Sequence, residues 1–291
     1  MFVRPARPPA DYAEYDFCLL LIACVDVVRF NSQVLDDVLL ACSVGMHEVA
    51  RGILIRTAYC QIGAFLELVL SQRQSSQMSA NSEVPNTDVS AAFTSIRQPE
   101  SSEFLNLTPQ AVEFCACPRS DSGFNSPGWM AFGKRLQYAA ESAGFSNSIS
   151  AGIAGAFQEM ADNATTHSQA AATALGGYQW GQNEFEFVVA DVGIGVLQSL
   201  RTCSEFVSVN DHADALALAV TRGASRFGSG TGHGNGFRQL FTSLASLGGE
   251  LRFRSGDQAL TVAGETLNKT GAQLSQRPEY RGFLVSARCR S

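Results

Sequence analysis

The sequence predicts an α/β domain that follows an apolar, helical N-terminal region. Of its 291 residues, 45% are hydrophobic, which suffices to bury a sizeable core. The composition changes sharply over residues 71–102, where Ser, Gln and Pro are typical of a flexible linker. From residue 103 onward, stretches of two-residue alternation mix with stretches whose apolar residues recur at helical spacing. We therefore divide the chain into an N-terminal region (1–70), a linker (71–102) and a domain (103–291).

The N-terminal region is helical in character from Val34 to Leu70. Its apolar positions are too dense for a helix with a solvent-facing side, so it must pack on another element or pair with a second copy in a homodimer. The preceding apolar run, Phe17–Val25, is too short to span a bilayer, and acidic residues precede it where a signal peptide is basic. We expect this run to be a buried strand or helix segment of a soluble protein without a membrane partner.

The net charge and the cysteine content of the chain indicate which kinds of partner and which cellular compartment to expect. The net charge of −6 and the lack of a basic run argue against a nucleic-acid-binding protein. Charged residues make up only 16% of the chain, and so weakly charged a surface favours a protein partner. The eight cysteines are irregularly spaced, and Cys115 and Cys117 would share one face of a strand without a second pair at metal-site spacing. We expect buried thiols and a cytoplasmic location.

The elements of the domain follow from their patterns. A strand over Ala111–Cys117 ends at Pro118, a loop covers 120–127, and helices are expected over Gly128–Ala143 and Asn147–Ser168. Two strands, Ala172–Trp180 and Glu184–Ala190, flank a Gly-Gln-Asn turn and predict a hairpin. The rest predicts a helix, a glycine-rich stretch, a helix and three strands, over Asp211–Thr221, Gly223–Asn235, Gly236–Leu247, Leu251–Arg254, Gln258–Val262 and Gly282–Arg288.

Three polar residues recur every four positions in the second of these helices. Glu159, Asn163 and His167 therefore line one face. The amide oxygen of Asn163 suits a hard cation such as Mg²⁺, and the Glu159 carboxylate suits the activation of a nucleophile. The alternative interpretation is an ordinary solvated helix face.

A second motif places a carboxylate and two glycines where a strand ends. Asp191, Gly193 and Gly195 follow the apolar run of the hairpin's second strand. The glycines allow a tight turn and the close approach of a ligand, and the aspartate is an acceptor for the exocyclic amine of adenine. The alternative is an aspartate that only caps the turn or the next helix.

A third motif has glycine at every second position from 228 to 236 and then a helical pattern. Gly232, Gly234 and Gly236 are the last three of this run. Glycines that open a helix form an anion-binding arrangement, since free N–H groups and the helix dipole face the ligand. The chain lacks the lysine of a P-loop, and the G-x-G-x-x-G spacing of a dinucleotide-binding turn is absent. A flexible surface loop is the alternative.

In this order and at these separations, the three motifs resemble the N box, G1 box and G2 box of the GHKL ATPase superfamily, over about 103–290. The resemblance implies a Bergerat-type ATP-binding fold, an α/β two-layer sandwich with helices on one face of a mixed, largely antiparallel sheet. It implies that Glu159 is the catalytic base, that Asn163 binds Mg²⁺ and that His167 lines the nucleotide site. It further implies contacts with ATP from the remaining motif residues, with Asp191 at the adenine amine: Asp191, Gly193, Gly195, Gly232, Gly234 and Gly236.

The sequence departs from the family at two points. Thr166 stands where histidine kinases often carry a basic residue, and Gly282-Phe283 stands where many members have Gly-Thr in the last strand. Whether Arg222, Arg226 or Arg238 reaches the phosphates instead stays open.

Three functions are compatible with these motifs. The first is a regulatory kinase of the anti-sigma type that phosphorylates Ser or Thr on a protein partner. The second is a sensor histidine kinase with His47 as phosphoacceptor. The third is an ATP-gated binding module without significant catalysis, which an intact Glu159 argues against.

Overall fold

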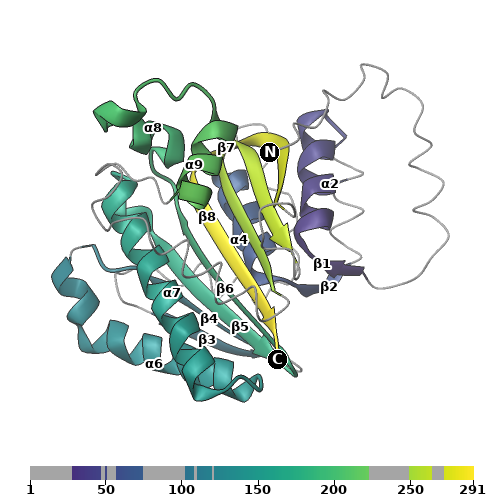
Figure 1. Cartoon of the computed structure of the whole chain (residues 1–291). Helices are drawn as coiled ribbons and strands as arrows, with labels where there is room; N and C mark the ends of the chain where they lie inside the picture. The colour runs from purple at the N-terminus through teal and green to yellow at the C-terminus, as the bar shows by residue number, and fades with distance from the viewer. Residues whose placement is uncertain are drawn as a thin grey trace.

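The computed structural model describes residues 28–46, 50, 57–74, 102–107, 110–119, 121–222, 249–263 and 272–291. It is a mixed α/β protein built on one open sheet with the strand order β3-β4-β5-β6-β8-β7, in which every neighbouring pair is antiparallel (Figure 1). The strands are β3 (Ser102–Leu107), β4 (Gln110–Ala116), β5 (Leu175–Gly181), β6 (Glu184–Asp191), β7 (Glu250–Ala263) and β8 (Ala272–Arg290).

Helices pack against this sheet, and a short parallel pair of strands lies apart from it. The helices are α2 (Ser32–Ser43), α4 (Ile62–Gln74), α6 (Pro127–Ser142), α7 (Asn147–His167), α8 (Gly195–Arg201) and α9 (His212–Arg222). The parallel pair is β1 (Val28–Phe30) with β2 (Thr57–Cys60). No helix in the described ranges is both long enough and apolar enough to cross a membrane.

One face of the sheet is covered by α6 and α7. Serine caps begin both helices, Ser126 for α6 and Ser146 for α7. The core between these helices and the sheet is rich in aromatic rings that contact one another, and it contains Trp129, Phe132, Phe157, Tyr178, Phe185 and Phe187. The free thiols of Cys115 and Cys117 are buried in the same core, as their shared strand face predicts. We call this side the aromatic face.

The opposite face is covered by α2 and α4. Alternate residues of β6 separate the two sides, since Phe187 and Val189 belong to the aromatic face while Val188 and Ala190 pack against α4. A second core on this side joins apolar side chains of both helices to the sheet. Two buried carboxylates of α2 and α4 contact arginines of β7, and we therefore call this side the charged face.

One expectation about the architecture is wrong. Helices cover both faces of the sheet rather than one, because the apolar residues of α4 find their partners on β6 and β8. The sheet, expected to be mixed and largely antiparallel, is antiparallel in every described pair. The expected helical stretch from Val34 to Leu70 contains α2 and α4, but strand β2 interrupts it and α4 continues to Gln74.

Most elements expected from residue 110 onward are confirmed. These are the strand β4, the helices α6, α7 and α9, and the hairpin of β5 and β6, although residues 171–173 form a 3₁₀ turn instead of the start of β5. The two strands expected over 251–254 and 258–262 form one strand, β7, with register shifts between them. The helix expected over 236–247 lies outside the described residues.

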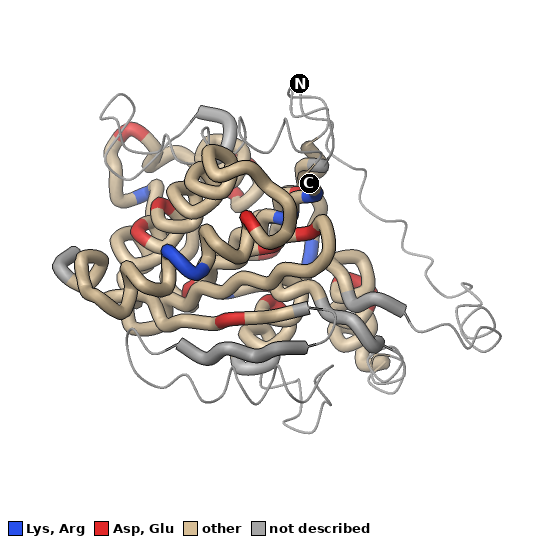
Figure 2. Tube along the Cα trace, turned by 90° about the horizontal axis from the view of Figure 1, so that it is seen from below, with Lys and Arg blue, Asp and Glu red and all other residues tan. Residues whose placement is uncertain are grey.

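Charged residues are spread thinly over the fold. Figure 2 shows lysine and arginine interspersed with aspartate and glutamate along the described chain, with no long stretch of one sign.

Candidate functional site

Helix α7 carries the first of the three motifs. The Ser146 side chain caps its start by accepting a hydrogen bond from the N–H of Ile149. Apolar side chains at helical spacing bury one face of α7 in the aromatic core. Glu159, Asn163 and His167 lie beside that face, and each is half-buried. The helix expected from the sequence is confirmed, and with it the shared face of these three residues.

Asp191 ends strand β6 and is almost completely buried, with 2% of its surface exposed. Its Oδ1 accepts a hydrogen bond of 2.8 Å from the N–H of Gly193, and the N–H of Phe283 also bonds to the carboxyl group. Burial raises the pKa of Asp191 to about 7, because water no longer solvates the charge, although both N–H groups act in the opposite direction. The groups that lower this pKa within the described chain are therefore backbone amides, not cations.

The loop after Asp191 is bonded to the chain that leaves α7. The N–H of Ile194 donates to the carbonyl oxygen of Ser168 (2.9 Å), and the N–H of Val192 donates to Thr173 Oγ1 (3.0 Å). Gly193 lies so close that a Cβ atom there would be 2.2 Å from the Ser168 oxygen, so a side chain cannot be accommodated. Because Ser168 directly follows the helix, these contacts bring the first and second motifs together.

Strands β7 and β8 form the other side of this loop. Gly282 has a φ of +104°, and a Cβ atom there would be 2.1 Å from the carbonyl oxygen of Asp191. The hydroxyl of Tyr280 donates to the same oxygen at 3.3 Å. Ser255 Oγ donates to the Gly282 carbonyl (2.8 Å) and accepts from the N–H of Val196 (2.9 Å). The loop is thus held from two directions by the protein itself.

Sequence reasoning did not single out three of these supporting residues: Thr173, Tyr280 and Ser255. An isolated hydroxyl in or beside a strand carries no periodic signal, so nothing in the sequence alone marks it. Gly282 stood out only through its neighbour Phe283, which replaces the threonine of a family pattern. Gly195 has a φ of +73° and begins α8, so it serves the local backbone as well as any pocket.

The third motif cannot be placed against the first two. Gly232, Gly234 and Gly236 lie outside the described residues, as do His47, Arg226 and Arg238. Helix α9 ends at Arg222, immediately before this stretch of the chain.

The residues that are described offer two kinds of chemistry. Asp191 presents a buried acceptor, and the α7 stripe presents a carboxylate and a carboxamide, which are ligand types that Mg²⁺ prefers. In the described part of the chain, no group of three or more His, Cys, Asp or Glu side chains is arranged to hold a metal ion. Sites that hold Mg²⁺ through one or two protein oxygens and the phosphates of a substrate do not need such a group.

Comparisons with known proteins add nothing to this picture: no family model, no curated protein and no solved structure matches the chain.

Proposed function

We propose that the Asp191 loop and the α7 stripe form the Mg-ATP site of a GHKL-type regulatory protein kinase. The observation that carries this proposal is the buried Asp191 carboxyl, which lies in a loop bonded to the residue after His167. A buried carboxylate is costly unless donors surround it, and a ligand amine would add one donor to the backbone N–H groups that the described chain directs at Asp191. The packing of α6 and α7 on one sheet face also agrees with the family core, to which α2 and α4 are then additions.

The residues present fit the ligand that this proposal requires. Adenine offers an amine donor, and Asp191 is an acceptor that backbone N–H groups have already oriented. Guanine presents a carbonyl oxygen at the same position and would meet a carboxylate with no proton between them. The site therefore selects for adenine when Asp191 is ionised.

Each motif residue has one task in this function. Asp191 accepts the hydrogen bond of the adenine amine, and Asn163 gives its amide oxygen to Mg²⁺. Glu159 accepts the proton of a serine or threonine hydroxyl on a partner protein as that oxygen becomes a nucleophile. Bound Mg-ATP would supply the γ-phosphoryl group, which passes to this hydroxyl oxygen as its bond to ADP breaks and ADP leaves. His167 ends α7 beside the Asp191 loop and belongs to the wall of the same site.

The acid stability of the phosphorylated side chain distinguishes this kinase from the alternatives. Phosphoserine and phosphothreonine survive acid, whereas a phosphohistidine at His47 would not. We expect an acid-stable label on a partner protein after incubation with γ-labelled ATP. An acid-labile label on the chain would instead identify a histidine kinase, and binding without label would identify a nucleotide-gated module.

The binding test is Asp191→Asn, titrated with ATP and with GTP. The N–H of Gly193 keeps the remaining oxygen of the new side chain, so its NH₂ group faces the ligand and opposes the adenine amine. We expect ATP affinity to fall roughly 10- to 100-fold, because a hydrogen bond to a charged acceptor contributes about 1.5–3 kcal/mol. Asp257→Asn, on β7, is the matched control and should bind ATP normally. Unchanged ATP affinity of folded Asp191→Asn would refute the adenine assignment.

The chemical test compares two neighbours on α7. Glu159→Gln should keep ATP affinity and lose turnover, because a general base acts in the transition state and contributes about 10²–10⁴-fold. Asn163→Ala should lose the part of the binding that depends on Mg²⁺. Both variants are titrated with and without Mg²⁺ and then assayed for phosphate transfer. Full activity of Glu159→Gln would exclude Glu159 as the base.

A further inference from the structure

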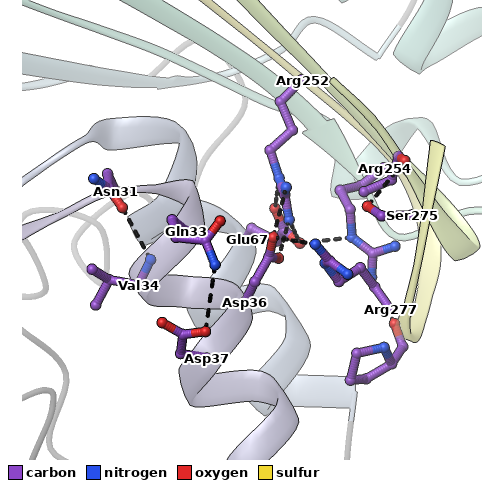
Figure 3. Close-up of polar contacts among 12 residues, drawn as sticks. Asn31, Gln33, Val34, Asp36, Asp37, Glu67, Arg252, Arg254, Ser275 and Arg277 are labelled. Atoms are coloured by element: carbon purple, nitrogen blue, oxygen red, sulfur yellow. Dashed lines mark hydrogen bonds and ion pairs between the residues drawn. The ribbon is translucent and has the colours of Figure 1, made fainter. Parts of the chain in front are cut away.

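A network of buried charges joins the N-terminal helices to β7 and β8 on the charged face. Arg252 and Arg254 alternate along β7 with apolar residues that face the other way. Arg254 and Glu67 of α4 are completely buried, at 0% exposure each, and Arg254 Nε lies 2.6 Å from Glu67 Oε1. Arg252 contacts both Glu67 Oε2 (2.9 Å) and Asp36 Oδ1 of α2 (2.6 Å), and Arg277 of β8 contacts Asp36 Oδ2 (2.8 Å). Figure 3 shows these side chains converging between the helices and the strands.

The charges in this network are matched. Burial acts to raise the pKa of Glu67, but the charges and hydrogen bonds of Arg252 and Arg254 outweigh it, so the pKa lies below its usual value. Buried ion pairs can often be replaced by apolar residues without loss of stability. The presence of buried ion pairs therefore does not by itself explain the role of this network, and the residues that it contacts have to be considered.

The Nη1 and Nη2 groups of Arg254 donate to backbone carbonyls at the place where the pairing of β7 with β8 is irregular. The pairing of β7 with β8 shifts register between Arg254 and Gly256 and again between Gly256 and Gln258. At this point Arg254 Nη1 donates to the carbonyl of Gln258 (2.7 Å), and Nη2 donates to the carbonyl of Pro278 (2.6 Å). The guanidinium group thus spans the irregular stretch and fixes β8 where ladder hydrogen bonds are interrupted.

The stretch of β8 that follows Pro278 is the part that touches the Asp191 loop. Tyr280 and Gly282 both contact the carbonyl oxygen of Asp191, as described above. The Arg254 guanidinium lies 5.7 Å from the centre of the Tyr280 ring. Gln74, the last residue of α4, pairs with the backbone of Arg281 in both directions, at 2.6 Å and 3.0 Å. Helix α4 therefore holds this strand segment through Glu67 and through Gln74.

We propose that Arg254, anchored by Glu67, is a positioning residue for Asp191: it holds residues 278–282 against the Asp191 loop, so that helix α4 controls the affinity of the site for ATP. The proposal rests on the function proposed above for Asp191, but its geometric part does not depend on any ligand. A change at α4 would reach the site through one strand, without a contact between α4 and nucleotide.

The test measures the titration of the Asp191 carboxyl by ¹³C NMR in the full chain without nucleotide, and then the Kd for ATP by calorimetry. Burial raises the pKa values of two neighbouring groups, Tyr280 of β8 and Cys117 directly after β4, and the charge of Asp191 adds to both shifts. Glu67→Gln and Arg254→Met each remove part of the contact that holds residues 278–282 in place. We expect this segment to loosen and water to reach Asp191. Its midpoint should then fall by about one pH unit or more toward the ordinary value, and ATP affinity should drop at least about tenfold.

The control variant is Glu184→Gln, which breaks the ion pair with Arg288 at the far end of β6. It should leave the Asp191 midpoint and ATP affinity as in the parent protein. Arg254→Lys keeps the charge opposite Glu67 but cannot span both carbonyl groups, so we expect it to fall between the parent and Arg254→Met. A purely structural network would lower the melting temperature of these variants and leave the Asp191 midpoint unchanged.

Gln74→Ala keeps the test decisive if the buried variants do not fold, since Gln74 is not part of the buried core. It should shift the Asp191 midpoint in the same direction and reduce hydrogen-exchange protection at 280–283. A folded Gln74→Ala or Glu67→Gln protein with the parent midpoint overturns the proposal. If the parent itself fails to bind ATP while the midpoint shifts as expected, the positioning role stands and the function proposed for Asp191 falls.

Discussion

Glu67 and Asp191, two buried carboxylates on opposite faces of the sheet, are held in opposite ways. On the charged face, Glu67 lies between two arginines, and its pKa is lowered in spite of burial. On the aromatic face, Asp191 is equally buried but has backbone N–H groups as its described donors, and burial raises its pKa to about 7. The difference indicates that Glu67 completes its interactions within the chain, whereas Asp191 retains a capacity for a further donor.

The two faces also differ in how far their ion pairs are buried. On the aromatic face, rings that contact one another attach α6 and α7, and Arg135 of α6 pairs with the buried Glu113 of β4 at 2.7 Å. On the charged face, an apolar core attaches α2 and α4 together with ion pairs between residues far apart in the sequence. Both faces therefore combine packing with charge, but Arg135 is exposed, whereas Arg252 and Arg254 of the charged face are buried.

The largest effect should come from breaking the charged face alone. Glu67→Ala leaves Arg252 and Arg254 buried with one carboxylate fewer, and removing one partner of a buried ion pair costs about 3–5 kcal/mol. Glu279→Ala, an exposed position on β8, is the control and should change the free energy of unfolding by less than about 0.5 kcal/mol. Denaturant unfolding measures both. Equal stability of the two variants would show that the network is not coupled to folding.

Titration should distinguish the two carboxylates by sign. The lowered pKa of Glu67 means that its stabilisation is present above the unfolded value near 4.5 and is lost as pH falls through the folded value. The raised pKa of Asp191 means the reverse: stabilisation is full below about 3.8 and is lost as pH rises through about 7.

Two amide substitutions therefore respond to pH in opposite directions. The cost of Glu67→Gln should grow as pH rises from 3 to 6, while Asp191→Asn should gain stability relative to the parent from pH 4 to 8, by up to roughly 4 kcal/mol. The free energy of unfolding is measured for each variant at matched pH. If the free energies of unfolding of both variants, relative to the parent protein, changed with pH in the same direction, the contrast between Glu67 and Asp191 would be contradicted.

A steric change on the aromatic face should have a smaller and pH-independent cost. A Cβ atom at Gly176 would lie 2.5 Å from Cζ of Phe157, so Gly176→Ala overpacks the ring cluster. Overpacking of a dense core costs about 1–3 kcal/mol. Gly152→Ala, at an exposed position of α7 with nothing within 4 Å, is the control and should be neutral or stabilising. Because Arg135 and Glu113 form an ion pair on this face, a marked salt or pH dependence of the Gly176→Ala cost would show that the ring cluster is coupled to that pair.

The smallest effect tests whether the helices of both faces unfold together. Ser126 caps α6 and Asn31 caps α2, where its side chain accepts the N–H of Val34 at 3.0 Å. Each cap contributes about 1 kcal/mol, so Ser126→Ala and Asn31→Ala should lower the global free energy of unfolding equally. If α2 can detach on its own, Asn31→Ala would speed hydrogen exchange in α2 and leave global unfolding unchanged.

Features of the fold that depend on neighbouring residues could be predicted from the sequence, whereas features that depend on residues far apart in the sequence could not. Helix α7 and the hairpin of β5 and β6 are determined by local periodicity and turn chemistry, so their bounds could be predicted within a few residues. The register shifts of β7 depend on its pairing with β8, so one strand was expected as two. Strand β2 lies in an apolar run whose pattern alone does not distinguish strand from helix.

The candidate site shows the same limit. The alignment of Glu159, Asn163 and His167 on one face needs only helical spacing. The support of Asp191 by Tyr280 and Ser255 depends on strands more than sixty positions away, which no local pattern reports. Arg252 and Arg254 are typical of a solvent-facing strand side, and only their partners in α2 and α4 explain why they are buried.

The position of β8 between β6 and β7 has a consequence for how the chain acquires its fold. Asp36 and Glu67 are separated from their arginine partners on β7 by 185 to 216 positions, and in the described sheet β6 and β7 are joined through β8. At typical synthesis rates of about 5–20 residues per second, roughly 10–40 s pass between the appearance of Glu67 and that of Arg252. During that interval the Glu67 carboxylate lacks its arginines and α4 lacks its partner residues on β8, so folding should be slow, late and dependent on protection from aggregation.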